Sequence, residues 1–95
     1  MSIRFRIAPD IRFRIIEDEA VVVRQKAGDV VVLNGVGARV LQLIGDGLST
    51  EEVGDRVARE YDAQEAAIRD DVKAFFGELE ALKIIEDDPA DGGNP

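Results

Sequence analysis

The sequence predicts an α+β domain in which a small antiparallel sheet is followed by three helices. Two observations lead to this class. Strand-type patterns extend to about residue 33, first as apolar residues alternating with arginine and then as short runs of apolar, mostly β-branched residues, and from Asn34 onward apolar residues recur with helical spacing. The segments between the predicted strands are short, so consecutive strands must pair antiparallel. The order of three strands and then three helices indicates that the helices cover one face of the sheet.

The predicted sheet begins with Ile11–Ile16, in which apolar residues and arginine alternate. This is the pattern of a strand with one buried and one solvated face. A polar turn over residues 17–19 leads into Ala20–Gln25, which is rich in β-branched residues. Gly28 can supply the positive φ that the next hairpin requires. The third strand is Val30–Leu33, which completes a three-stranded meander.

Both ends of the chain are expected to lie outside the domain core. Ile3–Ile7 repeats the arginine alternation of the first sheet strand, and Pro9 separates the two copies. Proline cannot donate to a ladder, so we expect residues 1–8 to form an extended arm rather than an edge strand. Residues 86–95 contain no apolar residue larger than alanine, which predicts a disordered acidic tail. The domain proper is therefore expected over residues 9–85.

Three helices are predicted from capping signals and apolar spacing. Asn34 is the expected N-cap of the first helix, which ends at residues 45–47. Ser49 and Glu52 form a capping box at the start of the second helix, and Asp62 begins the third. The residues expected in the core are Val36, Val40, Leu41, Leu43, Ile44, Val53, Val57, Tyr61, Ile68, Val72, Phe75, Leu79 and Leu82, with Ile84 and Ile85 in a short closing segment.

The charge is unevenly distributed along the chain. The net charge is −8, but residues 1–26 carry six basic residues against four acids, and residues 27–95 carry six against sixteen. An acidic helical half repels phosphate backbones and accepts a basic peptide or protein surface, so we expect no nucleic-acid partner. The chain has no cysteine, no apolar run approaching the ~20 residues of a membrane span, and no signal-peptide pattern. We therefore expect a cytoplasmic protein without a membrane partner.

The sequence is poorly supplied for catalysis. It has no histidine and no cysteine, and only carboxylates could activate its few hydroxyl groups. Neighbouring acids such as Asp70 and Asp71 diverge by about 100° on a helix, so each such pair is a poor chelator. We expect no enzymatic activity, no metal and no cofactor.

Beyond these features, a set of apolar and turn positions resembles the PqqD-like family. The positions that carry the resemblance are Pro9, Val32-Leu33-Asn34, Gly37-Ala38, Val40-Leu41, Ile44, Asp46-Gly47, Ser49-Thr50-Glu51-Glu52-Val53, Tyr61, Asp71-Val72, Phe75-Phe76, Leu79, Leu82 and Ile84-Ile85. Their order and spacing, rather than any single motif, make the resemblance specific. It spans roughly residues 9–85.

The resemblance implies a winged-helix-like peptide-binding domain, also called a RiPP precursor recognition element. Such domains bind the leader segment of a ribosomally made precursor peptide and present it to a modifying enzyme, such as a radical SAM protein. The leader adds as a strand to the third strand and lies beside the third helix. Carried over residue by residue, this implies peptide binding at Val30, Val31, Val32 and Leu33 and at Arg69, Val72, Lys73 and Phe76.

Several alternatives remain open from the sequence. Phe76 can line a peptide pocket or complete the core against the first helix. The domain can also be a winged-helix DNA-binding regulator, or a structural subunit that docks on an enzyme. Strand edges in so small a domain can pair with each other and give a homodimer. The N-terminal arginines can form a basic stripe for a partner, although we favour a solvated strand face.

Overall fold

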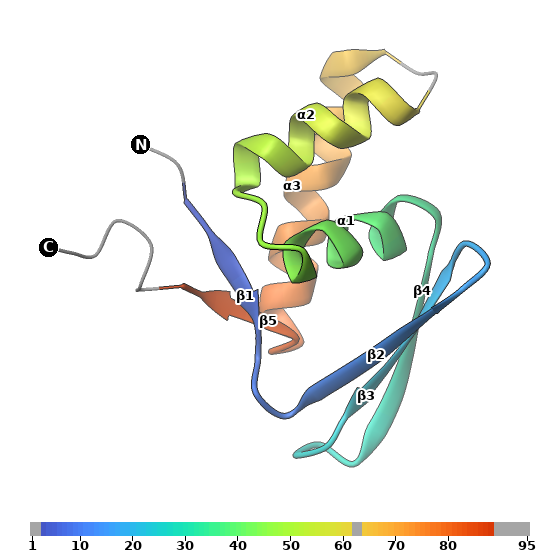
Figure 1. Cartoon of the computed structure of the whole chain (residues 1–95), viewed down its shortest axis with the longest axis vertical. Helices are drawn as coiled ribbons and strands as arrows, with labels where there is room; N and C mark the ends of the chain where they lie inside the picture. Colours follow the sequence, from blue (N-terminus) through green and yellow to red (C-terminus); the bar gives the residue numbers. More distant parts are fainter. Residues whose placement is uncertain (1–2, 62–63, 89–95) are drawn as a thin grey trace, which may run out of the picture.

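The computed structural model describes residues 3–61 and 64–88 and contains two sheets and three helices (Figure 1). The elements are β1 (Phe5–Ile7), β2 (Ile11–Ile16), β3 (Glu19–Arg24), β4 (Asp29–Asn34), α1 (Gly35–Gly45), α2 (Thr50–Glu60), α3 (Glu65–Ala81) and β5 (Ile85–Asp87). Strands β2, β3 and β4 form an antiparallel sheet in that order, and β1 pairs with β5. The predicted α+β class and the three-stranded meander are confirmed.

The meander separates an inner, helix-covered face from an outer face. On the inner face, Val22 of β3 lies between Phe13 of β2 and Val31 of β4, and Val22 is fully buried. On the outer face, Val30 and Val32 are 58% and 56% exposed. The apolar–arginine alternation of β2 therefore predicts correctly which of its residues face the core, whereas the continuous valine runs of β3 and β4 do not distinguish the two faces.

The N-terminal segment is a paired strand, which differs from the expected free arm. β1 pairs antiparallel with β5, with Ile7 opposite Ile85. The amide of Ala8 donates to the carbonyl oxygen of Ile84 at 2.9 Å. Pro9 does separate β1 from β2, but it directs β1 toward the C-terminal strand instead of into solvent. Burial of Ile85 supplies the reason, because its side chain is 1% exposed in this arrangement.

The expected acidic tail begins later than residue 86. Glu86 and Asp87 belong to β5, and the Glu86 carboxylate accepts a hydrogen bond from Arg6 at 2.8 Å. The short extended segment predicted at Ile84 and Ile85 is thus a real strand that continues into the acidic residues. The rest of the predicted tail, residues 89–95, lies outside the described residues.

The three helices bury the apolar residues that their spacing predicts. Val40, Leu41, Val53, Val57 and Leu79 are fully buried. Glycine brings α1 close to α3, because a Cβ built on Gly37 would lie 2.9 Å from the Phe75 ring. The absence of a side chain at Gly37 therefore permits the close contact between α1 and α3.

Two of the three expected helix starts can be compared with the structure. The Ser49 capping box is confirmed: the Glu52 amide donates to Ser49 Oγ at 3.2 Å, and the Ser49 amide donates to Glu52 Oε1 at 2.8 Å. The position of Asn34 as the N-cap of α1 is confirmed. The expected capping hydrogen bond from its side chain is wrong, because that side chain makes none. The next amide, that of Gly35, donates instead to the carbonyl of Asp18. Asp62, the expected start of α3, lies outside the described residues.

Candidate functional site

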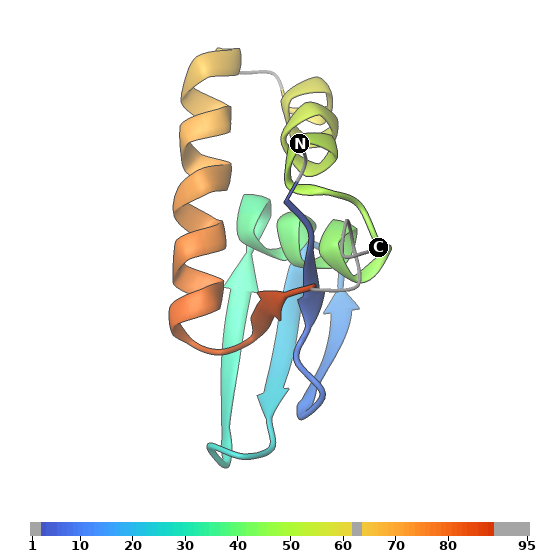
Figure 2. The same ribbon diagram turned by 90° about the vertical axis from the view of Figure 1, so that its left-hand side faces the viewer.

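Strand β4 forms the edge of the three-stranded sheet on the side of α3 (Figure 2). It pairs with β3 along one side. Within residues 3–61 and 64–88, no strand pairs with its other side. Such an edge carries backbone N–H and C=O groups that can accept a further strand.

A hydrogen bond at the end of β4 fixes which backbone groups point to the open edge. The Gly35 amide donates to the Asp18 carbonyl at 3.1 Å. These residues lie immediately outside the paired residues Glu19 and Asn34. In an antiparallel ladder, a bond that joins the outer neighbours of a pair marks that pair as non-hydrogen-bonded. The backbone groups of Asn34 therefore point away from β3.

The alternation of the ladder extends this assignment along the strand. Hydrogen-bonded and non-hydrogen-bonded pairs alternate, so the backbone N–H and C=O groups of Val30 and Val32 also point outward. Those of Val31 and Leu33 point to β3. Only two of the four predicted edge residues thus offer their main chain to a partner within Val30–Leu33.

The side chains of the same four residues divide in the opposite sense. Val31 and Leu33 are half-buried and pack against the core cluster, whereas Val30 and Val32 are exposed on the outer face. Val31 and Leu33 therefore contribute apolar surface beneath the edge. Backbone recognition and side-chain packing belong to different residues of β4.

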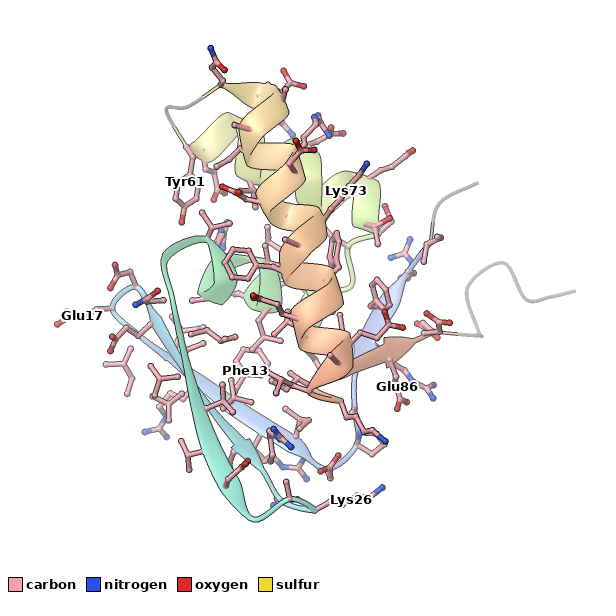
Figure 3. All side chains as sticks on the ribbon, turned by 180° about the vertical axis from the view of Figure 1, so that it is seen from behind. Phe13, Glu17, Lys26, Tyr61, Lys73 and Glu86 are labelled. Carbon is pink, nitrogen blue, oxygen red and sulfur yellow. The ribbon has the colours of Figure 1, made fainter. Side chains whose placement is uncertain are left out.

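The four predicted residues of α3 lie together, but in a groove on another side of the helix. Lys73 extends from the side of α3 away from β4 (Figure 3). The groove has a volume of about 430 Å³ and lies between β1, α2 and α3. Its lining consists of the four predicted residues Arg69, Val72, Lys73 and Phe76, with Ile3, Phe5, Thr50, Glu51, Gly54, Gly77 and Glu80. The structure therefore does not bring the strand half and the helix half of the predicted site together.

Phe76 settles against β1 rather than against α1. Its ring centroid lies 5.5 Å from that of Phe5, with the planes tilted by 31°. Phe76 is half-buried and lines the groove, and the expected alternative of a core contact with the first helix is wrong. The neighbouring ring, Phe75, makes the contact with α1 at Gly37.

Two of the other predicted helix residues are engaged in the structure of the domain. Arg69 donates to Glu65 at 2.9 Å and also to Asp55 of α2. These bonds, first that to Asp55 and then that to Glu65, raise the pKa of the Arg69 guanidinium. Val72 is only 2% exposed and belongs to the core. Lys73 is exposed and makes no hydrogen bond or ion pair with the described residues.

The face of α3 nearest the β4 end of α1 carries Phe75 and two acids. Phe75 lies over Gly37, in the first turn of the helix that directly follows β4. Asp71 lies four residues before Phe75 and Glu78 three residues after it, so helical spacing places all three on one face. Both acids are exposed. Sequence reasoning missed this face, although the offset of Phe75 from Phe76 around the helix could have suggested it.

Among residues 3–61 and 64–88, no group of three or more acidic, histidine or cysteine side chains could hold a metal ion. Within the same described part of the chain, no helix is sufficiently long and apolar to span a bilayer.

One protein family matches most of this chain by sequence. A sequence model of one protein family, described as Coenzyme PQQ synthesis protein D (PqqD), matches residues 19–85. This range runs from the start of β3 to the first residue of β5. None of the curated proteins that were compared matches the chain.

Two solved structures share the fold. TbiB1 in complex with the TbiA(beta) leader peptide has a TM-score of 0.79 and 26% sequence identity, over 85% of this chain and 94% of that chain. A lasso peptide synthetase B1 complexed with the leader peptide has a TM-score of 0.76 and 23% identity, over 87% of this chain and 98% of that chain. At 23% identity, the second similarity supports the fold alone.

Proposed function

The chain belongs to the PqqD family, and from this membership and the free edge of β4 we propose that it binds the leader segment of a ribosomally synthesised precursor peptide. The leader adds as a strand to β4, and the domain presents the rest of the precursor to a modifying enzyme. The observation that carries the proposal is the outward direction of the Val30 and Val32 backbone groups. TbiB1, whose structure is a leader-peptide complex, provides independent support.

The geometry gives each part of β4 a separate task. Backbone pairing with Val30 and Val32 supplies affinity that is insensitive to the side chains of the leader. Selectivity comes from leader side chains that point toward the helix side of the edge. There they meet the half-buried Val31 and Leu33 and, on α3, Phe75.

The charge around this edge favours a basic leader. Asp71 and Glu78 share the Phe75 face of α3, whereas the carboxylate of Asp29, at the start of β4, is already paired with Arg24 at 3.3 Å. Lysine or arginine in the leader would therefore be attracted to this side of the protein, at a rate that falls as salt is added. We propose Asp71, Phe75 and Glu78 as the α3 contribution to the leader site, because Arg69, Val72, Lys73 and Phe76 line the other groove.

The proposal assigns the domain a binding role and leaves the chemistry to its partner. The described residues offer no histidine or cysteine and no metal-binding cluster, and a strand edge has no chemistry of its own. The partner is a peptide-modifying enzyme, with a radical SAM protein as one example. A second copy of this chain could pair along the same β4 edge, in which case leader peptide and homodimer would compete.

Isothermal calorimetry with the leader peptide of the precursor encoded beside this gene tests the proposal. In Val32→Pro, the ring removes an amide that points to the open edge, a position where proline is tolerated. The loss of one net hydrogen bond should weaken leader binding by about tenfold. Val32→Ala is the matched control, because it keeps the amide and should bind the leader as the parent chain does.

Two results would count against the β4 site. The first is a folded Val32→Pro variant, with an unchanged circular dichroism spectrum, that binds the leader with parental affinity. The second is equal loss of affinity in the proline and alanine variants, which would assign recognition to the Val32 side chain. Sedimentation at the calorimetric concentration determines whether a homodimer dissociates as the leader binds.

A further inference from the structure

The opposite edge of the sheet, formed by β2, is also open. Within the described part of the chain, β2 pairs only with β3. The Gln25 amide donates to the Asp10 carbonyl at 3.1 Å, just outside the pair formed by Ile11 and Arg24. This bond marks that pair as non-hydrogen-bonded, so the backbone groups of Ile11 point away from β3.

The same alternation directs the backbone groups of Phe13 and Ile15 to the open edge. The amide of Ile11 is already used, since it donates to the carbonyl of Ala8 at 3.0 Å. The available stretch of β2 is therefore centred on Phe13 and Ile15. Six residues long and free of proline, β2 has no feature of the backbone that would prevent a further strand from pairing.

An apolar groove lies beside this edge. It has a volume of about 530 Å³ and is bounded by β2, the end of β1 and the last turns of α1. Ile7, Phe13 and Ile15 are half-buried and give the groove its apolar lining. Gln42 and Asp46 on the α1 side and Arg12 of β2 provide polar groups at its border.

The outer face of β2 carries positive charge beside the open edge. Arg12 and Arg14 are both exposed there and alternate with the groove-lining residues. Arg14 makes no hydrogen bond or ion pair with the described residues. Arg12 donates only to the backbone carbonyls of Pro9 and Ile11, at 3.1 and 3.0 Å. Neither guanidinium is neutralised by a carboxylate in the described part of the chain.

We propose that the β2 edge is a second strand-accepting site, whose ligand is an extended segment of a partner protein in which Asp or Glu alternates with apolar residues. In such a strand, the apolar side chains enter the groove beside Phe13 and Ile15. The carboxylates then lie on the outer face opposite Arg12 and Arg14, where opposite charges on neighbouring strands attract. This site is separate from the leader site, since β3 lies between the two edges.

The charge pattern decides between this ligand and two others. A second copy of β2 would place arginines of the two copies next to each other, and like charges on adjacent strands are unfavourable. A basic leader would meet the same repulsion at β2. At β4, by contrast, the outer face carries the uncharged Val30 and Val32, so the two edges select ligands of different charge.

Nuclear magnetic resonance with the ¹⁵N-labelled full chain tests this inference. The probe is an acetylated and amidated peptide of about seven residues in which valine and glutamate alternate, long enough to span β2. It should shift the amide signals of Phe13 and Ile15 and leave those of Val30 and Val32 unchanged. The double variant Arg12→Glu/Arg14→Glu should bind this probe about tenfold or more weakly. It should instead bind a peptide of the same length in which valine and lysine alternate.

Two controls separate strand pairing from general attraction between charges. Two control peptides have the same sequence but carry N-methyl groups on alternate residues, either on the valines or on the glutamates. Each keeps the charge of the probe but loses the N–H groups along one of its two edges. The peptide that is methylated on the edge facing β2 should fail to bind. The Val32→Pro variant should bind the probe normally even though its binding of the leader is weakened. Absence of binding by the probe, binding at β4, or equal binding by both N-methylated peptides would overturn the proposal.

Discussion

At the scale of single residues, the Glu52 carboxylate at the start of α2 makes the stability of the fold depend on pH. Hydrogen bonds from the Ser49 backbone and side chain lower the pKa of Glu52 in the folded chain. Bonding to Arg39 lowers the pKa of Glu60 in the same way. When the folded pKa is the lower one, the unfolded chain takes up the proton first, so stability is lost as the pH falls.

We therefore predict that the contribution of these two carboxylates to the free energy of unfolding is constant well above about pH 4.3, the ordinary Glu value, and decreases below it. Glu52→Gln replaces the carboxylate by an amide, whose oxygen can still complete the capping box but which cannot titrate. Urea denaturation between pH 7 and pH 3 should show a shallower decrease for this variant. An identical pH dependence in the two proteins would mean that the Glu52 bonds do not persist in solution.

Gly37 should be intolerant of a side chain. Its Cβ would lie 2.9 Å from the Phe75 ring, closer than carbon atoms normally approach. We expect Gly37→Ala to lower the free energy of unfolding by about 1–3 kcal/mol, the usual range for overpacking. Phe75→Leu should be partly compensatory in the double variant, because it removes the ring atoms that the new methyl group meets. Additive losses in a thermal-denaturation double-mutant cycle would contradict this contact.

Residue-level prediction succeeded where the cause is local and failed where it depends on neighbours. Ser49 and Glu52 lie three residues apart, so their mutual bonds are encoded in one helical turn. Phe75 lies in the predicted apolar stripe of α3 and Phe76 beside it, and spacing cannot tell which of the two rings meets α1 and which meets β1. The face of α3 that we propose for the leader site was missed for that reason.

At the scale of elements, the alternation along β4 predicts the pattern of hydrogen exchange. The amides of Val30 and Val32 point to solvent, whereas those of Val31 and Leu33 point to β3. We expect fast exchange at the first two and slow exchange at the other two in the free protein. Addition of the leader should slow exchange at Val30 and Val32, as measured by deuterium exchange and magnetic resonance. Protection limited to α3 amides would instead indicate recognition without strand pairing.

The bounds of β2, β3 and β4 follow closely from the sequence because apolar alternation and turn residues are local signals. These signals do not predict which residues of β4 point their backbone groups to β3 and which point them to the open edge. This direction depends on which backbone pairs form at the strand ends, for example Gly35 with Asp18, and no side-chain pattern specifies that choice. The sequence thus identified β4 as the candidate edge but could not separate Val30 and Val32 from Val31 and Leu33.

At the scale of the whole molecule, the pairing of β1 with β5 ties the two ends of the chain together. Removal of residues 1–8 would expose Ile85 and Phe76, which pack against β1. We expect this truncation to reduce the free energy of unfolding by roughly 2–4 kcal/mol, because apolar area of the Ile85 and Phe76 side chains becomes exposed to water. Urea denaturation measures the loss.

Arg6→Gln is the control for this truncation. It removes only the exposed ion pair with Glu86, and exposed pairs contribute about 1 kcal/mol or less. If the truncated chain is as stable as the parent, β1 is not part of the cooperative fold. The residues of this ion pair lie 80 positions apart, so the local sequence at either end of the chain does not predict the contact. The same distance explains why β1 was expected to be a free arm.

The division of labour along β4 also has an evolutionary consequence. Leader affinity in this arrangement comes from the main chain of Val30 and Val32, which every residue except proline supplies equally well. Mutations at these two positions can therefore accumulate, and change what the outer face attracts, without altering how firmly the leader is held. Val31 and Leu33 are restrained by the core instead. The outer face of β4 can therefore diverge in sequence while the backbone pairing that we propose for the leader is kept.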